Sequence, residues 1–222
     1  MARPITATKA LTAADADNIA LAQALAGAGL LTLNGVAVSG GVATLDTARR
    51  VGITSAGNDT GITFTIKGTD YSGNVISEVV TGANAAVAST LQDFLTVTSV
   101  RGSDAAAGNV SAGTTDVGSS PWFPLNNHIT PFDVGVQTHL VSGAATWTIE
   151  VTRERVLSDM QIYRAGFTNA PSVPVAFGWP GLVGLAADAS GSINSVVLAA
   201  RLTILSGTGT VQADIVQTGI SN

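Results

Sequence analysis

The sequence predicts an all-β protein of antiparallel β-sandwich or jelly-roll-like units, with one short N-terminal helix and an extended N-terminal arm. Polar and apolar residues alternate in several stretches, most clearly in residues 62–67 and 146–152, and a period of two is typical of strands. Turn signals rich in Gly, Asn, Asp and Ser recur at the spacing of a sandwich. Of the 222 residues, 45% are apolar and 11% charged, which argues against a highly charged disordered chain.

Residues 1–29 lack the strand pattern and are expected to form an arm followed by an Ala-rich helix. Residues 1–9 show no core pattern, which favours an extended arm. Thr12 and Asp15 are typical of a helix N-cap and an acidic first turn. Apolar residues then follow helical spacing in residues 19–26, and Gly27 ends the run. Alternatively, this segment belongs to the arm and becomes ordered only on a partner.

Residues 30–118 are expected to form the first β-sandwich unit. The clearest strand is residues 62–67, where Ile62, Phe64 and Ile66 share the inward face. Asn34 and Gly35 form a turn signal inside the first β-rich stretch. The expected β-rich stretches of this unit are residues 30–38, 50–54, 62–67, 75–81, 94–101 and 109–112.

Residues 119–222 are expected to form a second β-sandwich unit, after a boundary rich in Gly, Ser and Pro. Residues 140–146 and 205–210 are alike, because each is a strand followed by a Ser-Gly turn and a second strand. We interpret them as two hairpins with the same turn chemistry; a duplicated unit is the alternative. Residues 163–184 contain three prolines and are expected to form an edge or a long loop. The expected strands are residues 132–141, 146–152, 196–204 and 211–215.

No group of residues predicts catalysis, so we expect a protein that is not an enzyme. The two histidines, His128 and His139, are not accompanied by a Gly-x-Ser-x-Gly nucleophile motif. The three glutamates, Glu78, Glu150 and Glu154, do not predict an opposed pair of carboxylates. Glu150 falls on the outward side of its alternating strand.

The sequence also predicts no cofactor and no metal. There is no cysteine, and no His or carboxylate cluster has zinc-site spacing. Asp59 and Asp70 lie in expected turns, where the backbone conformation favours Asp. The alternative interpretation is that these two residues contact calcium. A net charge of −5 argues against a nucleic-acid partner. No apolar run reaches the length of about twenty residues that spans a membrane, so no membrane partner is expected.

The outward positions of the expected strands are mostly Thr, Ser, Asn and Gln rather than Lys and Glu. Few surface charges lower the desolvation cost of packing against a neighbour. The sequence therefore predicts a protein that works assembled, in a homo-oligomer or a lattice.

Three segments carry a resemblance to a known class of proteins. They are RRVGITSAGNDTGITFTIKGTDYSGNVISEVVTG (residues 49–82), TVTSVRGSDAAAGNVSAG (residues 96–113) and RLTILSGTGTVQADIVQTG (residues 201–219). Together they resemble virion structural proteins of tailed bacteriophages, and among these most of all a capsid decoration (cement) protein. The resemblance rests on β-hairpin patterns, and it carries over no catalytic residue.

The resemblance implies a β-sandwich protein that binds the outer surface of an assembled phage capsid and stabilises it. Its partners would be the major capsid protein and further copies of itself, as a homotrimer. It would be synthesised in the host cytoplasm and reside on the capsid surface of the virion. One alternative is a phage tail or head-fibre component that contacts other virion proteins or a host glycan. An alternative of another class is a bacterial surface adhesion module.

Two kinds of residue are expected at the interface of such a protein. The arm would reach across neighbouring subunits, and aromatic side chains would supply most of the contact energy. The expected interface residues are Arg3, Pro4, Ile5, Trp122, Phe123, Phe177 and Trp179.

Overall fold

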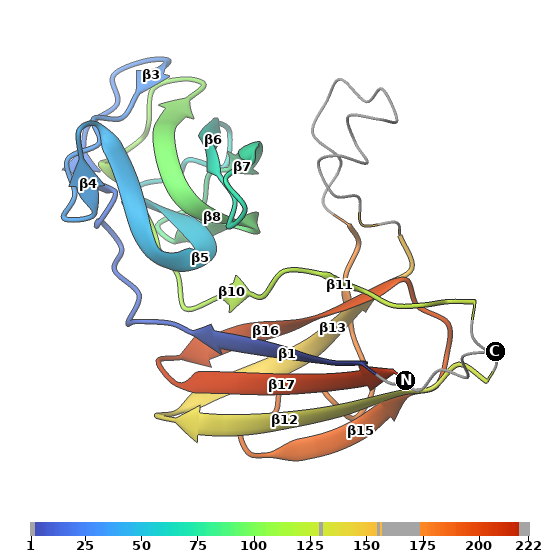
Figure 1. The fold of residues 1–222 in the computed structure, drawn as a ribbon. Coiled ribbons are helices and arrows are strands. Elements are labelled where there is room, and N and C mark those ends of the chain that lie inside the picture. The colour runs from blue at the N-terminus through green and yellow to red at the C-terminus, as the bar shows by residue number, and fades with distance from the viewer. Residues whose placement is uncertain (1–2, 129–130, 155, 157–173, 218–222) are drawn as a thin grey trace. The chain divides into compact units, whose positions relative to one another are not determined.

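The computed structural model describes residues 3–128, 131–154, 156 and 174–217. In these residues every strand pairing is antiparallel and no helix occurs, so the all-β prediction is confirmed. The chain divides into two compact units (Figure 1). Unit 1 comprises Met1–Thr12 and Val117–Asn222, and unit 2 comprises Ala13–Asp116. Unit 2 is thus inserted in the chain of unit 1, and residues 1–29 are divided between the two units.

Unit 1 is sandwich-like, because two sheets enclose one apolar core (Figure 1). One sheet has the order β1 (Arg3–Ala10), β17 (Thr210–Gln217), β12 (Val134–Ser142) and β15 (Ala189–Ile193). The other has the order β10 (Gly118–Ser119), β16 (Ala199–Gly207), β13 (Ala145–Thr152) and β14 (Phe177–Gly178), with β11 (Phe123–Pro124) also on β16.

The core of unit 1 is supplied by alternate residues of its long strands. Trp147, Ile149 and Val151 of β13 are fully buried, as the alternation of the sequence predicts. Val211, Ala213 and Ile215 of β17 are buried in the same way. Side chains of about this size each contribute roughly 1.5–3 kcal/mol when fully buried, so these strands supply much of the stability of the sandwich.

The two similar segments that the sequence predicts as hairpins are not hairpins, because the two strands of each lie in different sheets. Each joins the two sheets, one as β12–β13 and the other as β16–β17, while β12 pairs with β17 and β13 with β16. Their turns also meet, because the Gly209 amide donates to the Ala144 carbonyl at 2.9 Å. Gly143 and Gly207 have φ angles of 74° and 90°, a region that favours glycine. The use of one turn chemistry therefore has a structural reason in both of these connections between the sheets.

Strand β1 replaces the free arm expected at the N-terminus. Residues 3–9 are extended, as expected, but they belong to a sheet, and the register runs from Arg3 opposite Gln217 to Ala10 opposite Thr210. The inward side chains of β1 include a small one, Ala7, and a charged one, Lys9, both buried. Such a strand lacks the apolar alternation by which strands are recognised, which explains the missing core pattern.

Unit 2 is one eight-stranded sheet around its own core of Ile, Val, Leu and Phe side chains. Its two longest strands, β5 and β8, have 14 and 16 residues, and their pairing is interrupted by register shifts. Figure 1 shows β5 strongly curved. The order is β2 (Ala20–Gln23), β9 (Val110–Thr114), β5 (Val42–Ser55), β8 (Val87–Gly102), β6 (Thr63–Thr69) and β7 (Val75–Thr81), with β3 (Gly29–Leu30) on β8 and β4 (Val38–Ser39) on β5.

The helix expected in the first 29 residues is wrong. The Ile19 amide donates to the Ala112 carbonyl of β9 at 3.0 Å, and the Leu21 amide donates to Asn34 Oδ1 at 2.9 Å. Both amides are therefore engaged with residues distant in sequence. Ile19 is buried, whereas Leu21 is 43% exposed, so the two do not form an apolar helical face. Long-range pairing with β9 overrides the helix propensity of this Ala-rich segment.

Candidate functional site

The seven expected interface residues lie in unit 1, but at separate places. Arg3, Pro4 and Ile5 are in β1 at the edge of the four-stranded sheet, where Pro4 is exposed and Ile5 packs against the core. Trp122 and Phe123 lie at β11, on the other sheet. Of the Pro-rich stretch 163–184, residues 163–173 are outside the described residues, and the remainder carries Phe177 and Trp179.

Trp179 joins the two sheets of unit 1 at one edge. Its amide donates to the Ile149 carbonyl of β13, and its indole N–H donates to the Ser192 carbonyl of β15, both at 2.9 Å. The ring packs against the core, as does that of Phe123. Phe177 is 37% exposed, with the guanidinium of Arg153 5.6 Å from its ring centre. Trp179 and Phe123 thus cover the core, while Phe177 remains partly open to a partner.

Trp122 covers a polar cluster on the five-stranded sheet, which we call the Arg201 cluster. The guanidinium of Arg201 lies 4.4 Å from the centre of the Trp122 ring and 2.7 Å from a Glu150 oxygen. The hydroxyl of Thr203 lies 2.8 Å from the same Glu150 oxygen and 3.0 Å from the hydroxyl of Ser119. The exposed fractions of the Arg201 and Glu150 side chains are 9% and 15%. Burial of a charged pair requires this degree of hydrogen bonding, because each unpaired charge would be costly.

The Arg201 cluster was missed from the sequence, although a signal was present. Glu150 is the one charged residue of β13, and Arg201 is the one charged residue of β16. Two isolated, opposite charges in strands that are otherwise neutral indicate a cross-strand pair. The two residues lie directly opposite each other in the register. Chemically, the cluster neutralises its own charges and holds β10, β13 and β16 together.

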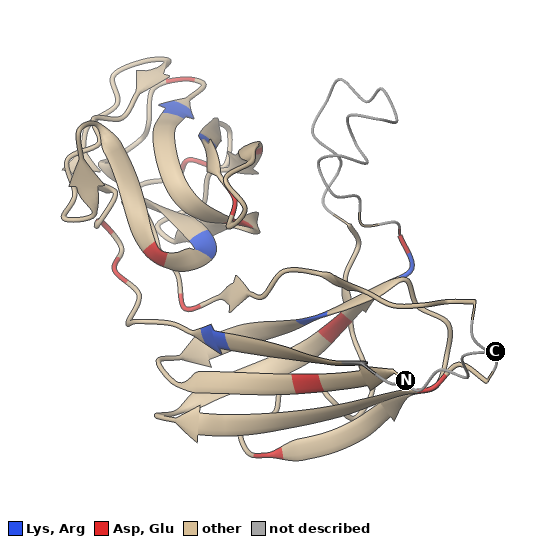
Figure 2. Cartoon of the chain, in the orientation of Figure 1, with Lys and Arg blue, Asp and Glu red and all other residues tan. Residues whose placement is uncertain are grey.

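The outward side of the four-stranded sheet is a second surface, which we call the polar face. Figure 2 shows few charged segments on these strands. Asp214 accepts hydrogen bonds from Thr6 Oγ1 at 2.6 Å and from Gln212 Nε2 at 3.0 Å, so its charge is solvated by neutral groups of the face. The outward side also includes Pro4, Ala10, Gly135 and Val216, and its polar side chains are Thr6, Thr8, Gln137, His139, Ser190, Ser192, Gln212 and Asp214.

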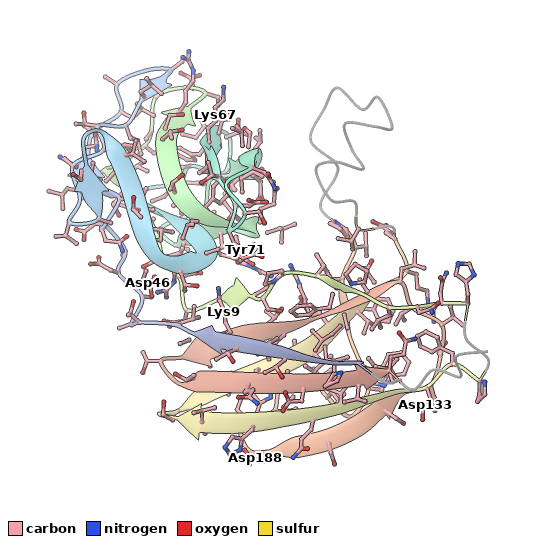
Figure 3. All side chains as sticks on the ribbon, in the orientation of Figure 1. Lys9, Asp46, Lys67, Tyr71, Asp133 and Asp188 are labelled. Carbon is pink, nitrogen blue, oxygen red and sulfur yellow. The ribbon has the colours of Figure 1, made fainter. Side chains whose placement is uncertain are left out.

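The polar face includes an exposed contact between a histidine and a carboxylate. His139 Nδ1 lies 2.5 Å from Asp188 Oδ2, and the Leu140 amide donates to Asp188 Oδ1 at 2.8 Å. Asp188 lies next to β15, and it is labelled in Figure 3. The Leu140 amide and then the His139 ring hold the pKa of the Asp188 carboxyl below its ordinary value. The pair joins β12 to the segment before β15.

Unit 2 exposes apolar side chains along its edge strand β7. Val75 is 80% exposed and Val79 is 62% exposed. Tyr71, in the turn before this strand, is 59% exposed. Its position is labelled in Figure 3. Glu78 of β7 accepts the amides of Leu91 and Gln92 of β8, at 2.7 and 2.9 Å. The Glu78 carboxylate therefore accepts hydrogen bonds from the backbone of β8 rather than facing a second acidic side chain.

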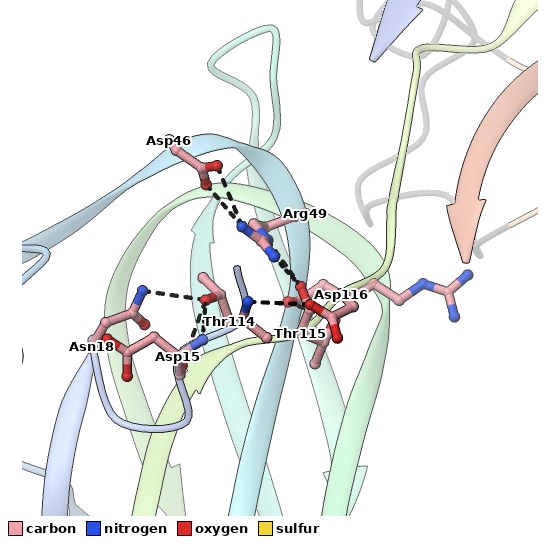
Figure 4. A network of polar contacts seen from close by, with 9 residues as sticks. Asp15, Asn18, Asp46, Arg49, Thr114, Thr115 and Asp116 are labelled. Atoms are coloured by element: carbon pink, nitrogen blue, oxygen red, sulfur yellow. Dashed lines mark hydrogen bonds and ion pairs between the residues drawn. The ribbon is translucent and has the colours of Figure 1, made fainter. Parts of the chain in front are cut away.

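The ends of unit 2 are joined by a polar network around Arg49 (Figure 4). The Arg49 side chain is fully buried, and its Nε donates to the Thr115 carbonyl at 2.9 Å while Nη1 lies 3.2 Å from Asp46. Beside it, the Asp15 amide donates to Thr114 Oγ1 at 3.1 Å, and the Thr114 amide donates to the Asp15 carbonyl at 2.7 Å. The first and last residues of the insert are thus held side by side.

The turn aspartates have backbone roles. Asp70 Oδ1 accepts the amides of Ser72 and Asn74 at 2.8 and 2.9 Å, as the turn chemistry predicts. Asp59 is buried, and its Oδ1 accepts the Ala107 amide at 2.7 Å. Within the described ranges, no group of three or more His, Cys, Asp or Glu residues is placed to hold a metal ion. The same residues include no helix with the length and apolar character to cross a membrane.

Comparison with known proteins returned no match, whether with family models, with curated proteins or with solved structures.

Proposed function

We propose that this protein is a non-enzymatic virion structural protein that binds the outer surface of an assembled phage capsid and stabilises it as a decoration protein. Its partners in this proposal are the major capsid protein and further copies of itself. The observation that carries the proposal is the polar face of unit 1, together with the resemblance of three segments to virion proteins. The alternatives are a tail or head-fibre component and a bacterial surface adhesion module.

The polar face suits contact with another protein because it is regular and has little charge. Its four strands present mainly Thr, Ser and Gln side chains; Asp214 is the one Asp or Glu of these strands on this side, and Asp188 contacts His139 from the segment before β15. The nearest cation of β1, Lys9, points to the opposite side and is buried. Hydroxyl and amide groups cost less to remove from water than ammonium or carboxylate groups. A neighbour with complementary hydrogen bonds can therefore cover this surface at low cost.

The location of the protein is tested by counting its copies in particles. Virions from the source of the sequence are purified, and this chain is quantified by mass spectrometry against the major shell protein. We expect a ratio near one, or a simple fraction such as one third. A few copies per particle would favour the tail or fibre alternative. Absence from the particles would contradict the virion proposal.

The role of the polar face is tested by adding charge to it. Thr8→Lys and Gln137→Lys place cations on two outward positions, and we expect at least a tenfold loss of capsid affinity. The matched control is Thr81→Lys, which changes an exposed threonine of β7 in unit 2. If the two unit 1 variants bind capsids like the control, the polar face is not the contact surface.

A further inference from the structure

Strand β1 is joined to its own sandwich only through the whole of unit 2. It is the first strand of the described residues, forms the edge of the four-stranded sheet and pairs with β17, the last strand of these residues. Between β1 and the next strand of unit 1 lies the insert Ala13–Asp116. No short hairpin therefore dictates which chain supplies β1 to a given β17.

The edge of β17 is specific for the sequence of β1. The register covers eight residue pairs, from Arg3 opposite Gln217 to Ala10 opposite Thr210. Thr6 Oγ1 donates to Asp214 Oδ1 at 2.6 Å, and Ala7 and Leu11 are buried in the core of unit 1. Every copy of the chain carries this strand, so a second copy offers the edge an identical occupant.

The hinge after β1 is short. Leu11 belongs to the core of unit 1, whereas the Ala14 amide donates to Asp116 Oδ1 at 3.1 Å in unit 2. Only Thr12 and Ala13 lie between these two anchors. Exchange between copies needs a change of conformation at these two residues alone, and short hinges are a common setting for it.

We propose that β1 is exchanged when the chain self-associates, so that β1 of one copy completes the four-stranded sheet of the next. All contacts between β1 and β17 are the same in the closed and exchanged forms. The balance between them is therefore set by the hinge and by protein concentration. The exchange rests on the self-association in the proposed function, but it requires no capsid. Three copies linked in this way close a ring, and the ring would be the homotrimer.

Disulfide trapping tests the exchange, and the chain contains no cysteine of its own. Thr8 and Gln212 lie directly opposite each other on the polar face. Facing residues of an antiparallel pair have Cα atoms about 4.5–5.5 Å apart, within the range of a disulfide. Chains with Thr8→Cys and chains with Gln212→Cys are co-expressed, so that the strands choose partners while folding, and are then oxidised with glutathione disulfide.

The matched control uses the same Gln212→Cys chain with a His139→Cys chain. His139 faces Gln212 from the other side, in β12, which is not expected to exchange. We expect the Thr8 and Gln212 pair to give at least ten times more disulfide-linked dimer of the two chains than the control pair. Light scattering of the unmodified protein should show a closed oligomer.

The proposed exchange is contradicted if the test pair and the control pair give equal yields of disulfide-linked dimer, while the double variant Thr8→Cys/Gln212→Cys forms its disulfide within one chain. Failure of the double variant to close in any chain would overturn the register itself. A protein that stays monomeric at all concentrations would overturn the proposal as well. These experiments contain no particle, so their failure is distinct from a failure to find the protein in virions.

Discussion

Arg49 holds together the region where the chain enters and leaves unit 2. Its guanidinium is buried between the Asp46 carboxylate and the Thr115 carbonyl. Arg49→Met keeps most of the apolar stem but leaves the carbonyl without this donor. We expect the free energy of unfolding of unit 2 to fall by about 3 kcal/mol, since loss of a charged hydrogen bond and an unsatisfied buried acceptor each cost about 1–3 kcal/mol. Urea denaturation measures the change.

A matched arginine on the surface provides the control for this prediction. Arg101 of β8 is exposed and belongs to the same unit. Arg101→Met should change the free energy of unfolding by no more than about 0.5 kcal/mol. Equal effects of the two substitutions would show that Arg49 has no special role in the stability of unit 2.

The pair of His139 and Asp188 makes the stability of unit 1 depend on pH in acid. The pKa of Asp188 is lower in the folded chain than its ordinary value of 3.8, because of the Leu140 amide and the His139 ring. The folded chain therefore binds this proton less readily than the unfolded chain. The resulting stabilisation is present above pH 3.8 and is lost as the pH falls through the lower folded value.

Asp188→Asn should remove this contribution. We expect the variant to melt at a lower temperature than the parent at pH 6, with the difference shrinking to nothing in strong acid. Thermal unfolding followed by circular dichroism at several pH values measures it. The effect is small because both side chains are exposed. A difference in melting temperature that stays constant down to strong acid would contradict the assignment.

Gly68 permits the close approach of β6 and β8. A Cβ atom at this position would lie 1.8 Å from the Thr96 carbonyl oxygen, so the backbone of β8 would have to move. The register of the two strands shifts at this residue. We expect Gly68→Ala to destabilise unit 2 by about 3 kcal/mol, at the upper end of the usual cost of overpacking. Denaturant unfolding measures it.

Gly61 is the matched control for the substitution in β6. It lies just before the same strand, and a Cβ atom there would meet nothing within 4 Å. Gly61→Ala should leave stability within about 0.5 kcal/mol of the parent. If Gly68→Ala is equally harmless, the two strands are not packed as closely as the structure has them.

Strands with a strong apolar alternation were predictable, and segments whose structure depends on distant residues were not. Phe64 and Ile66 of β6, and Trp147, Ile149 and Val151 of β13, are buried as the alternation predicts. The helix expected in residues 12–29 is wrong, because Asn18 and Ile19 bond to β9 about ninety residues later. Strand β1 was hidden because it places Lys9 inward.

For the candidate site, too, features of a single strand were predictable, and features that depend on distant residues were not. The neutral polar side chains of the outward strand positions were visible in the sequence. Their gathering on one sheet was not, because it requires the pairing of β1 with β17 across nearly the whole chain. Glu150 was correctly placed on the outward side, but its burial with Arg201 beneath Trp122 depends on the neighbouring strands. The alternation of a sequence predicts which side of its strand a residue faces. The residues that surround it there depend on the order of the strands in the sheet.

The two units should fold independently. Each has its own core, and hydrogen bonds between Asp15 and Thr114 hold the ends of the insert together. We expect residues 13–116 alone to unfold cooperatively, because no strand of unit 2 lies outside this range. Circular dichroism during heating and amide proton dispersion in NMR spectra measure this.

The complementary protein replaces residues 13–116 with a flexible Gly-Ser linker of about ten residues. We expect it to retain the sandwich of unit 1, with the same tryptophan emission spectrum as the full-length chain, because all three tryptophans lie in this unit. The control is the full-length chain under the same conditions. A disordered product from either half would contradict the division into two folding units.

The pairing of the first strand with the last also sets the order of events on the ribosome. Thr6 and Asp214, which are hydrogen-bonded, are 208 positions apart in the chain. At about 5–20 residues per second, roughly 10–40 s of translation separate their synthesis. Unit 2 leaves the exit tunnel complete during this interval, while the nascent β1 has no partner. The strand exchange proposed above would then begin during translation, because successive ribosomes on one messenger RNA bring unpaired copies of β1 close to newly finished copies of β17.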